Sequence, residues 1–137
     1  MRVVLDTNIF LSGLISPDGV PDRLIRAWLD RRFLLVSHSL QLDEMREVSR
    51  REKIRALVRP VEAGRLVNQI ARLAEIPTSL PIVKRSRDPS DDFLLALCDV
   101  GVVDRLVTGD KNDLLALKRH GTATILTAAA FARELGI

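Results

Sequence analysis

The sequence predicts an α/β domain built on a mostly parallel sheet. Two observations predict this fold class: short apolar runs alternate with segments whose apolar residues recur at helical spacing, and the apolar runs lack the polar alternation of half-exposed strands. Both are typical of a sheet that is covered by helices on its two faces. With 137 residues the chain is most simply one domain, residues 1–137, long enough to bury a real core.

Four apolar runs are expected to form the strands. The first, residues 2–5, is typical of a strand that is buried on both faces. The other expected strands are residues 32–37, 104–109 and 122–126, with a weaker one near Ile82–Val83. Around this weaker candidate, residues 77–90 form the longest irregular stretch, which we interpret as a loop within one domain.

Helical patterns fill the intervals between the strands. The apolar run Ile9 to Leu14 follows the first strand, and residues 39–58 contain no internal helix breaker. Residues 91–100 are apolar nearly all round, which predicts a central helix, and Thr127 is expected to cap a last helix, Ala128–Leu135. Two further apolar faces at helical spacing are formed by Leu24, Ile25, Trp28 and Leu29, and by Leu66, Val67, Ile70, Leu73 and Ala74.

The composition is that of an ordinary globular protein. No apolar run approaches the roughly 20 residues that span a bilayer, and Asp6 interrupts the N-terminal apolar stretch too early for a signal peptide. We therefore expect a cytoplasmic protein without membrane contact, and we expect the lone Cys98 to pack in its core. The net charge of +3 permits a polyanionic partner. The basic residues form two clusters, Arg50, Arg51, Lys53, Arg55 and Arg59, and Lys84, Arg85 and Arg87.

Several carboxylates follow the predicted strands. Asp6 comes directly after the first strand, and Asp110 follows the strand that ends in "LVTGD". The carboxyl ends of parallel strands meet at one edge of a sheet, where binding sites of α/β proteins lie. Glu44, in the helix after the second strand, and Asp91 or Asp92, after the irregular loop, could join them.

Each of these acids also has a purely structural interpretation. Asp6 and Asp110 could each cap a helix, and Glu44 could be a solvated residue of a charged helix. In "DPSD", Asp88 would be the N-cap and Asp91 the third helical residue, close to a capping box. Because adjacent helical residues lie about 100° apart, Asp91 and its neighbour cannot both point into one site.

Convergence of these acids predicts a cation site. Three or four carboxylates in one cleft would repel one another unless a cation were present. Hard oxygen ligands without histidine or cysteine suit Mg²⁺ or Mn²⁺, which can hold phosphate oxygens and activate water for attack on a phosphodiester. The two histidines, His38 and His120, lie far apart in sequence, and neither has neighbours typical of a zinc site.

Four segments in order resemble one known family, the PIN domains, and specifically the bacterial PIN-like toxins. "VVLDTNIFLSGLIS" resembles the family's opening strand with its Asp-Thr-Asn signature, and "VSHSLQLDEMREVSR" its second acidic segment. "RDPSDDFLLALC" and "DRLVTGDKNDLLAL" resemble the third and the fourth, and "ILTAAAFAREL" is similar to the closing strand and helix. Asp-Thr-Asn alone is common, whereas the four motifs in this order are a strong match.

The resemblance implies a three-layer α/β/α sandwich with a central, mostly parallel sheet, and an Mg²⁺-dependent (or Mn²⁺-dependent) ribonuclease. The family's metal-binding and catalytic acids fall on Asp6, Glu44, Asp91 and Asp110, with Asp43 as an alternative to Glu44 and Asp92 as a fallback for Asp91. Asn8 and Thr108 match polar positions that support these acids, and Thr7 and Asn112 are further candidates.

The resemblance also implies partners. Many relatives are toxins of type II toxin–antitoxin pairs, held inactive by a small antitoxin and often homodimeric. RNA would be the substrate, with flanking phosphates held by basic side chains; the candidates are Arg50, Arg51, Arg85, Arg87 and Lys111.

Two other functions compete with the nuclease. An aspartyl-phosphate phosphatase also begins with a strand that ends in aspartate, but its usual acid/base would stand two residues after Asp6, where this chain has Asn8. A PIN-like module that only binds RNA or protein is the second alternative. Loss of an acid would favour such a module, whereas all four are present in this sequence.

Overall fold

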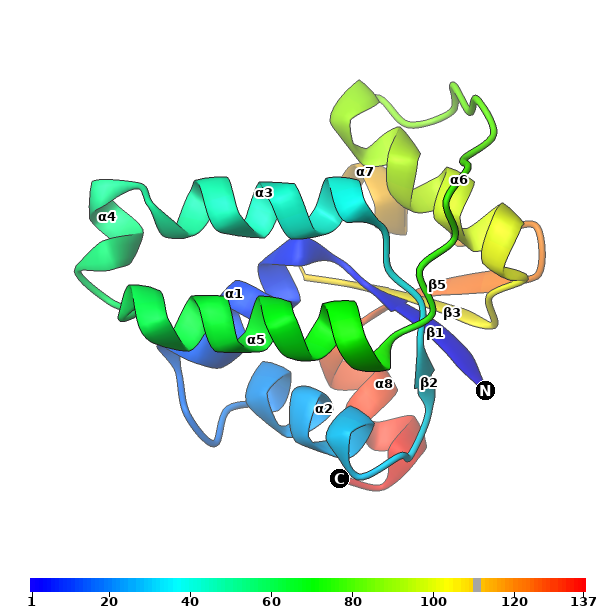
Figure 1. The fold of residues 1–137 in the computed structure, drawn as a ribbon. Coiled ribbons are helices and arrows are strands. Elements are labelled where there is room, and N and C mark those ends of the chain that lie inside the picture. The colour runs from blue at the N-terminus through cyan, green and yellow to red at the C-terminus, as the bar shows by residue number, and fades with distance from the viewer. Residues whose placement is uncertain (110–111) are drawn as a thin grey trace.

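The computed structural model describes residues 1–109 and 112–137 (Figure 1). The strands are β1 (Arg2–Leu5), β2 (Leu34–Leu35), β3 (Arg105–Thr108), β4 (Arg119–His120) and β5 (Ala123–Thr127). The helices are α1 (Thr7–Ile15), α2 (Val20–Leu29), α3 (Ser39–Ser49), α4 (Glu52–Arg55), α5 (Pro60–Leu73), α6 (Asp92–Gly101), α7 (Asn112–Leu115) and α8 (Ala128–Leu135), with a 3₁₀ turn, η1 (Pro89–Asp91).

The strands form one sheet in the order β2-β1-β3-β5-β4. All neighbours are parallel except β4, which runs antiparallel to β5. In this register Leu5 lies beside Val107, and Thr108 beside Thr127. The carboxyl ends of the two central strands, β1 and β3, therefore lie next to each other.

Helices cover both faces of the sheet, which confirms the predicted α/β fold with its mostly parallel central sheet. Side chains alternate along each strand, so that Val3 and Leu5 face one side and Val4 the other. The first side packs against α1, α2, α3, α5 and α8 through buried residues that include Phe10, Trp28 and Phe131. The second packs against α6 and α7.

Cys98 belongs to the core on the α6 side, as expected. Its side chain is buried, and burial raises the pKa of the thiol to about 12. No helix among the described residues is long and apolar enough to cross a membrane.

The helix expected over residues 39–58 is wrong in one respect, because it is broken after Ser49. Arg51 takes an extended backbone conformation (φ −66°, ψ 139°), and the short α4 follows it. The break turns the chain back, so that α5 lies alongside α3 (Figure 1) and Val58 is buried at the turn. Tertiary packing thus overrides the local helical pattern.

The weak strand expected near Ile82–Val83 is also wrong. These residues belong to the irregular segment between α5 and η1, and the side chain of Ile82 is 90% exposed. The sheet edge instead gains an isolated parallel bridge between Val36 and Glu75. The sequence pattern also failed to predict β4, which is too short and too polar to give an apolar signal.

Candidate active site

Asp6 lies at the end of β1 with its side chain almost fully buried, 1% exposed. Its backbone N–H donates to the Val107 carbonyl at 2.8 Å, which continues the β1–β3 ladder. Its Oδ2 accepts a hydrogen bond from Thr108 Oγ1 at 2.9 Å, and its Oδ1 accepts a long one, 3.4 Å, from the Asn8 N–H. The aspartate therefore caps α1 and also binds the last residue of the neighbouring strand.

Thr108, proposed from sequence as a supporting residue, is in hydrogen-bond contact with Asp6. It is completely buried at the end of β3, and its hydroxyl donates to the carboxylate. Asn8 is exposed, and it contacts Asp6 through its backbone N–H. Asn8 lines a hollow of about 270 Å³ together with Ser12, Gly109 and Thr127, next to the carboxyl ends of the strands.

A buried glutamine that the sequence analysis missed fixes α3 against the end of β1. Gln41 is fully buried, and its Nε2 donates to the Leu5 carbonyl at 2.7 Å and to Thr7 Oγ1 at 3.4 Å. Its Oε1 accepts from Ser37 Oγ at 2.6 Å. Gln41 and Met45 are both buried and lie four residues apart, on one face of α3. The sequence feature that could have revealed Gln41 is a polar residue on an otherwise apolar helical face.

Glu44 lies three residues after Gln41, on the same face of α3, and is half-buried. Its alternative, Asp43, points elsewhere: its side chain is 70% exposed and pairs with Arg46 at 3.1 Å. The anchored start of α3 thus carries Glu44 on the face that meets the end of β1.

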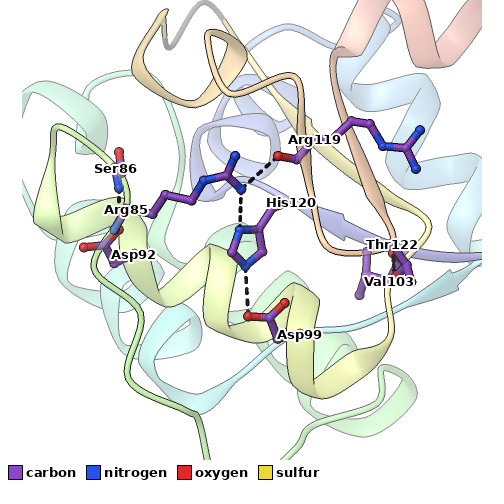
Figure 2. Close-up of polar contacts among 8 residues, drawn as sticks. All are labelled: Arg85, Ser86, Asp92, Asp99, Val103, Arg119, His120 and Thr122. Carbon is purple, nitrogen blue, oxygen red and sulfur yellow. Dashed lines mark hydrogen bonds and ion pairs between the residues drawn. The ribbon is translucent and has the colours of Figure 1, made fainter.

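The segment around "DPSD" adopts the capped turn expected from its sequence. Asp88 Oδ1 accepts from the Ser90 N–H at 3.0 Å, and Asp91 is the third residue of η1, 3% exposed. Asp92 is used differently, because its Oδ1 accepts the backbone N–H groups of Ser86 at 2.8 Å and Arg85 at 3.2 Å (Figure 2). Of the two candidate acids, Asp91 is therefore the buried one, and Asp92 holds the preceding loop.

The remaining acid of the predicted set, Asp110, lies outside the described residues, as does Lys111. Asn112 opens α7. Within residues 1–109 and 112–137, no three histidine, cysteine, aspartate or glutamate side chains form a group that could hold a metal ion. The described acids thus supply carboxylate oxygens, the donors that suit a hard dication, but not a complete ligand set.

The arginines predicted to bind substrate have different surroundings. Arg50 and Arg51 are exposed at the junction of α3 and α4, and Arg51 pairs with Glu47 at 3.6 Å. Arg87 is exposed in the loop before η1. Arg85 is also exposed, but its guanidinium makes contacts within the protein surface: Nη1 donates to the Arg119 carbonyl at 2.9 Å and bonds to the His120 ring (Figure 2).

The family of the chain follows from a comparison with models of known families. One model, described as PIN domain, matches residues 2–112, which include β1, α3, η1 and β3. No curated protein and no solved structure matches the chain. Because the model covers most of the sequence, this protein belongs to the PIN domain family, whose members are generally nucleases that typically use divalent metal ions.

Proposed function

We propose that this PIN domain is a metal-dependent endoribonuclease that hydrolyses RNA phosphodiester bonds. The observation that supports it best is the Asp6 carboxylate, which is buried at the carboxyl ends of β1 and β3 and is oriented by Thr108. A carboxylate that is buried beyond the carboxyl ends of parallel strands is a candidate functional group, because binding sites of α/β proteins lie at this edge of the sheet. The family's nuclease character makes phosphodiester hydrolysis the chemistry to test.

The residues that would hold a magnesium or manganese ion are Asp6, Glu44 and Asp91, with Asp110 as the predicted fourth. Asp6 and Asp91 are buried at the ends of β1 and η1, and Glu44 lies on α3, whose start is anchored by Gln41. A bound dication would supply charge neutralisation at the phosphate and activation of water. The chain's own part is to fix the carboxylates and to orient the RNA backbone.

The direct test is cleavage of a mixed RNA substrate by the purified protein. We expect cleavage with Mg²⁺ or Mn²⁺ and none after chelation with EDTA. Activity on a small phosphomonoester without any on RNA would instead favour the phosphatase alternative. Binding of RNA without metal-dependent cleavage would favour the binding module.

The Thr108 hydroxyl is expected to tune metal affinity. Thr108→Val removes the donor to Asp6 Oδ2 while keeping the shape of the side chain. Loss of a hydrogen bond that orients a metal ligand typically weakens metal binding by roughly 10–100-fold, which calorimetry with Mn²⁺ measures. Thr127→Val is the matched control, because Thr127 ends the neighbouring strand but caps α8 through the Ala130 N–H. Equal affinities of the two variants would contradict the role of Thr108.

The basic arm, which we define as residues 50–72, is the proposed RNA contact. It holds seven arginine and lysine residues against two glutamates, whereas the whole chain has a net charge of only +3. On α5, the exposed Arg65 and Arg72 line a hollow of about 590 Å³ with Asn68. Among the described residues no acid forms an ion pair with either of these two arginines. Both cations are therefore available to phosphates.

Removing two charges from this arm is expected to make RNA binding weaker and less salt-dependent. For Arg50→Ala/Arg51→Ala, the slope of log K against log salt should become shallower by about 1.4, since each phosphate contact to a single strand contributes about 0.7. The slope is measured by fluorescence anisotropy with a labelled single-stranded RNA in EDTA. Arg23→Ala/Arg31→Ala makes the same charge change at exposed positions on and after α2. If both double variants shift the slope equally, only net charge matters.

We also propose that the protein is a toxin, that an antitoxin protein is its partner, and that it forms a homodimer. It is supported by the resemblance of four motifs to the bacterial PIN-like toxins. Induction of the wild-type chain in a bacterial host should stop growth, and Asp6→Asn should not. A short neighbouring gene that encodes a DNA-binding protein would support the pairing, and its product should restore growth.

A further inference from the structure

The irregular segment before η1 is held in place by a polar network at Arg85. Its backbone N–H and that of Ser86 both donate to Asp92 Oδ1, at the start of α6. The Arg85 guanidinium Nη1 bonds to His120 Nδ1 at 2.7 Å and donates to the Arg119 carbonyl at 2.9 Å. One arginine thus joins the loop to α6 through its backbone and to β4 through its side chain (Figure 2).

The hydrogen bonds fix the state of the His120 ring. A guanidinium can only donate, so His120 Nδ1 must accept from Arg85. The hydrogen of the neutral ring is then on Nε2, which donates to Asp99 Oδ2 at 2.9 Å. The imidazole is therefore a directional bridge, with an acceptor toward the loop and a donor toward α6.

The other side of this bridge is rigid. The His120 side chain is only 11% exposed, and β4 pairs with β5 through His120 and Ala123. The following turn is tied down by Thr122 Oγ1, which donates to the Val103 carbonyl at 2.9 Å (Figure 2). Gly121 adopts φ +58°, and a Cβ there would stand 3.1 Å from Asp99 Oδ1. The turn therefore presents the imidazole from a fixed position close to α6.

The network leads directly to the third candidate acid. Asp92, whose carboxylate accepts hydrogen bonds from the Arg85 and Ser86 N–H groups, directly follows Asp91 in the chain. Asp91 is buried at the end of η1, and the segment that enters η1 has no regular secondary structure from Ile76 to Asp88. The bonds from Arg85 and Ser86 to Asp92 fix the last residues of this segment, and η1 with Asp91 lies between these bonds and α6.

We propose that Arg85 and His120 are positioning residues, which hold the loop and η1 so that the Asp91 carboxylate is preorganised for metal binding. This inference rests on the proposed metal-dependent function. It also gives Arg85 a role beyond the phosphate contact expected from sequence, because Nη1 of its guanidinium bonds to His120 and to the Arg119 carbonyl.

The test compares two substitutions of the same histidine in the full-length protein. Glutamine retains an acceptor and a donor on one amide group, so His120→Gln can keep both hydrogen bonds, whereas His120→Leu loses both. We expect His120→Leu to raise the Kd for Mn²⁺, measured by calorimetry, by roughly 10-fold or more, as for other residues that orient metal ligands. His120→Gln should stay within about 3-fold of the wild type, as rescue by a conservative substitution requires.

Three further measurements separate positioning from a general loss of structure. Arg105→Ala breaks an exposed ion pair with Glu134, on α8, and should leave the Kd for Mn²⁺ unchanged. Amide hydrogen exchange in residues 84–92 without metal should be faster in His120→Leu than in the wild type or in His120→Gln. The Kd for RNA in EDTA should not change in His120→Leu or in His120→Gln, because His120 itself is not assigned to the substrate.

The outcomes distinguish this inference from the function on which it rests. If the wild type binds no Mn²⁺, or if Asp6→Asn binds it equally well, the proposed function fails and the inference fails with it. If the wild type binds Mn²⁺ through Asp6 but His120→Leu binds with unchanged affinity, only the positioning role is overturned. The same holds if His120→Gln loses as much affinity as His120→Leu.

Discussion

Asp6→Asn is expected to reduce metal-dependent RNA cleavage by at least ~1000-fold, because a bound dication supplies several kcal/mol of transition-state stabilisation and each 1.4 kcal/mol is worth about tenfold in rate. Asparagine has nearly the shape of aspartate. Its single amide oxygen can still accept from the Asn8 N–H, and its amide NH₂ then faces Thr108 Oγ1, a hydroxyl that can accept a hydrogen bond instead of donating one. What it removes is the negative charge. The fold should therefore survive while the affinity for the cation falls.

The measurement is the single-turnover cleavage rate in Mg²⁺, with circular dichroism to confirm the fold. Asp43→Asn is the matched control, since it makes the same chemical change on an exposed acid of α3 that pairs with Arg46. Its rate should stay within about twofold of the wild type, because exposed ion pairs contribute little. Intact cleavage by Asp6→Asn would falsify the assignment of Asp6 as a metal ligand.

Phe131→Ala is expected to lower the free energy of unfolding by about 3–5 kcal/mol. The side chain is fully buried on α8, within the core that faces α1 and α2. Its ring packs edge-to-face on Phe33, with centroids 5.4 Å apart and planes at 67°. Truncation loses this contact and leaves a cavity between α8 and the sheet.

Urea denaturation measures the loss, and the exposed Ile82 supplies the control. Ile82→Ala removes an apolar side chain that is 90% exposed, so its effect should stay within about 0.5 kcal/mol. A loss below about 1 kcal/mol in Phe131→Ala would mean that α8 repacks and fills the cavity. The double variant Phe33→Ala/Phe131→Ala should be less destabilised than the two single losses predict together, since aromatic pairs couple by about 0.5–1.5 kcal/mol.

The fold class was predictable because its signal is repeated along the chain. The longer buried strands are short apolar runs, and most of the longer helices show an apolar face at helical spacing. Local pattern failed where tertiary contacts decide the conformation. Residues 39–58 have helical periodicity throughout, but packing of α5 along α3 requires the turn at Arg51. The short strand β4 forms by pairing with the edge of β5, which the local sequence does not indicate.

The residues of the candidate site also fall into two groups, those that the sequence indicated and those that only the structure reveals. Asp6 was proposed from its position after a strand and Thr108 from the family resemblance, and the structure brings these two side chains into contact. Gln41 was missed because a single polar residue in a charged helix gives no signal until its face is known to be buried. The role of Arg85 was unpredictable for a similar reason, since its partner His120 lies 35 residues away in a strand that the sequence does not reveal.

The contact between Asp6 and Thr108 has a consequence for the synthesis of this protein. The two residues are 102 positions apart, and they meet only when β3 has paired with β1. In a growing chain in which β3 has not yet been synthesised, Asp6 lacks the strand that orients it. Such long-range pairing forms late and slowly in folding. The proposed activity, which depends on an oriented Asp6, therefore requires that β3 has been synthesised and has paired with β1.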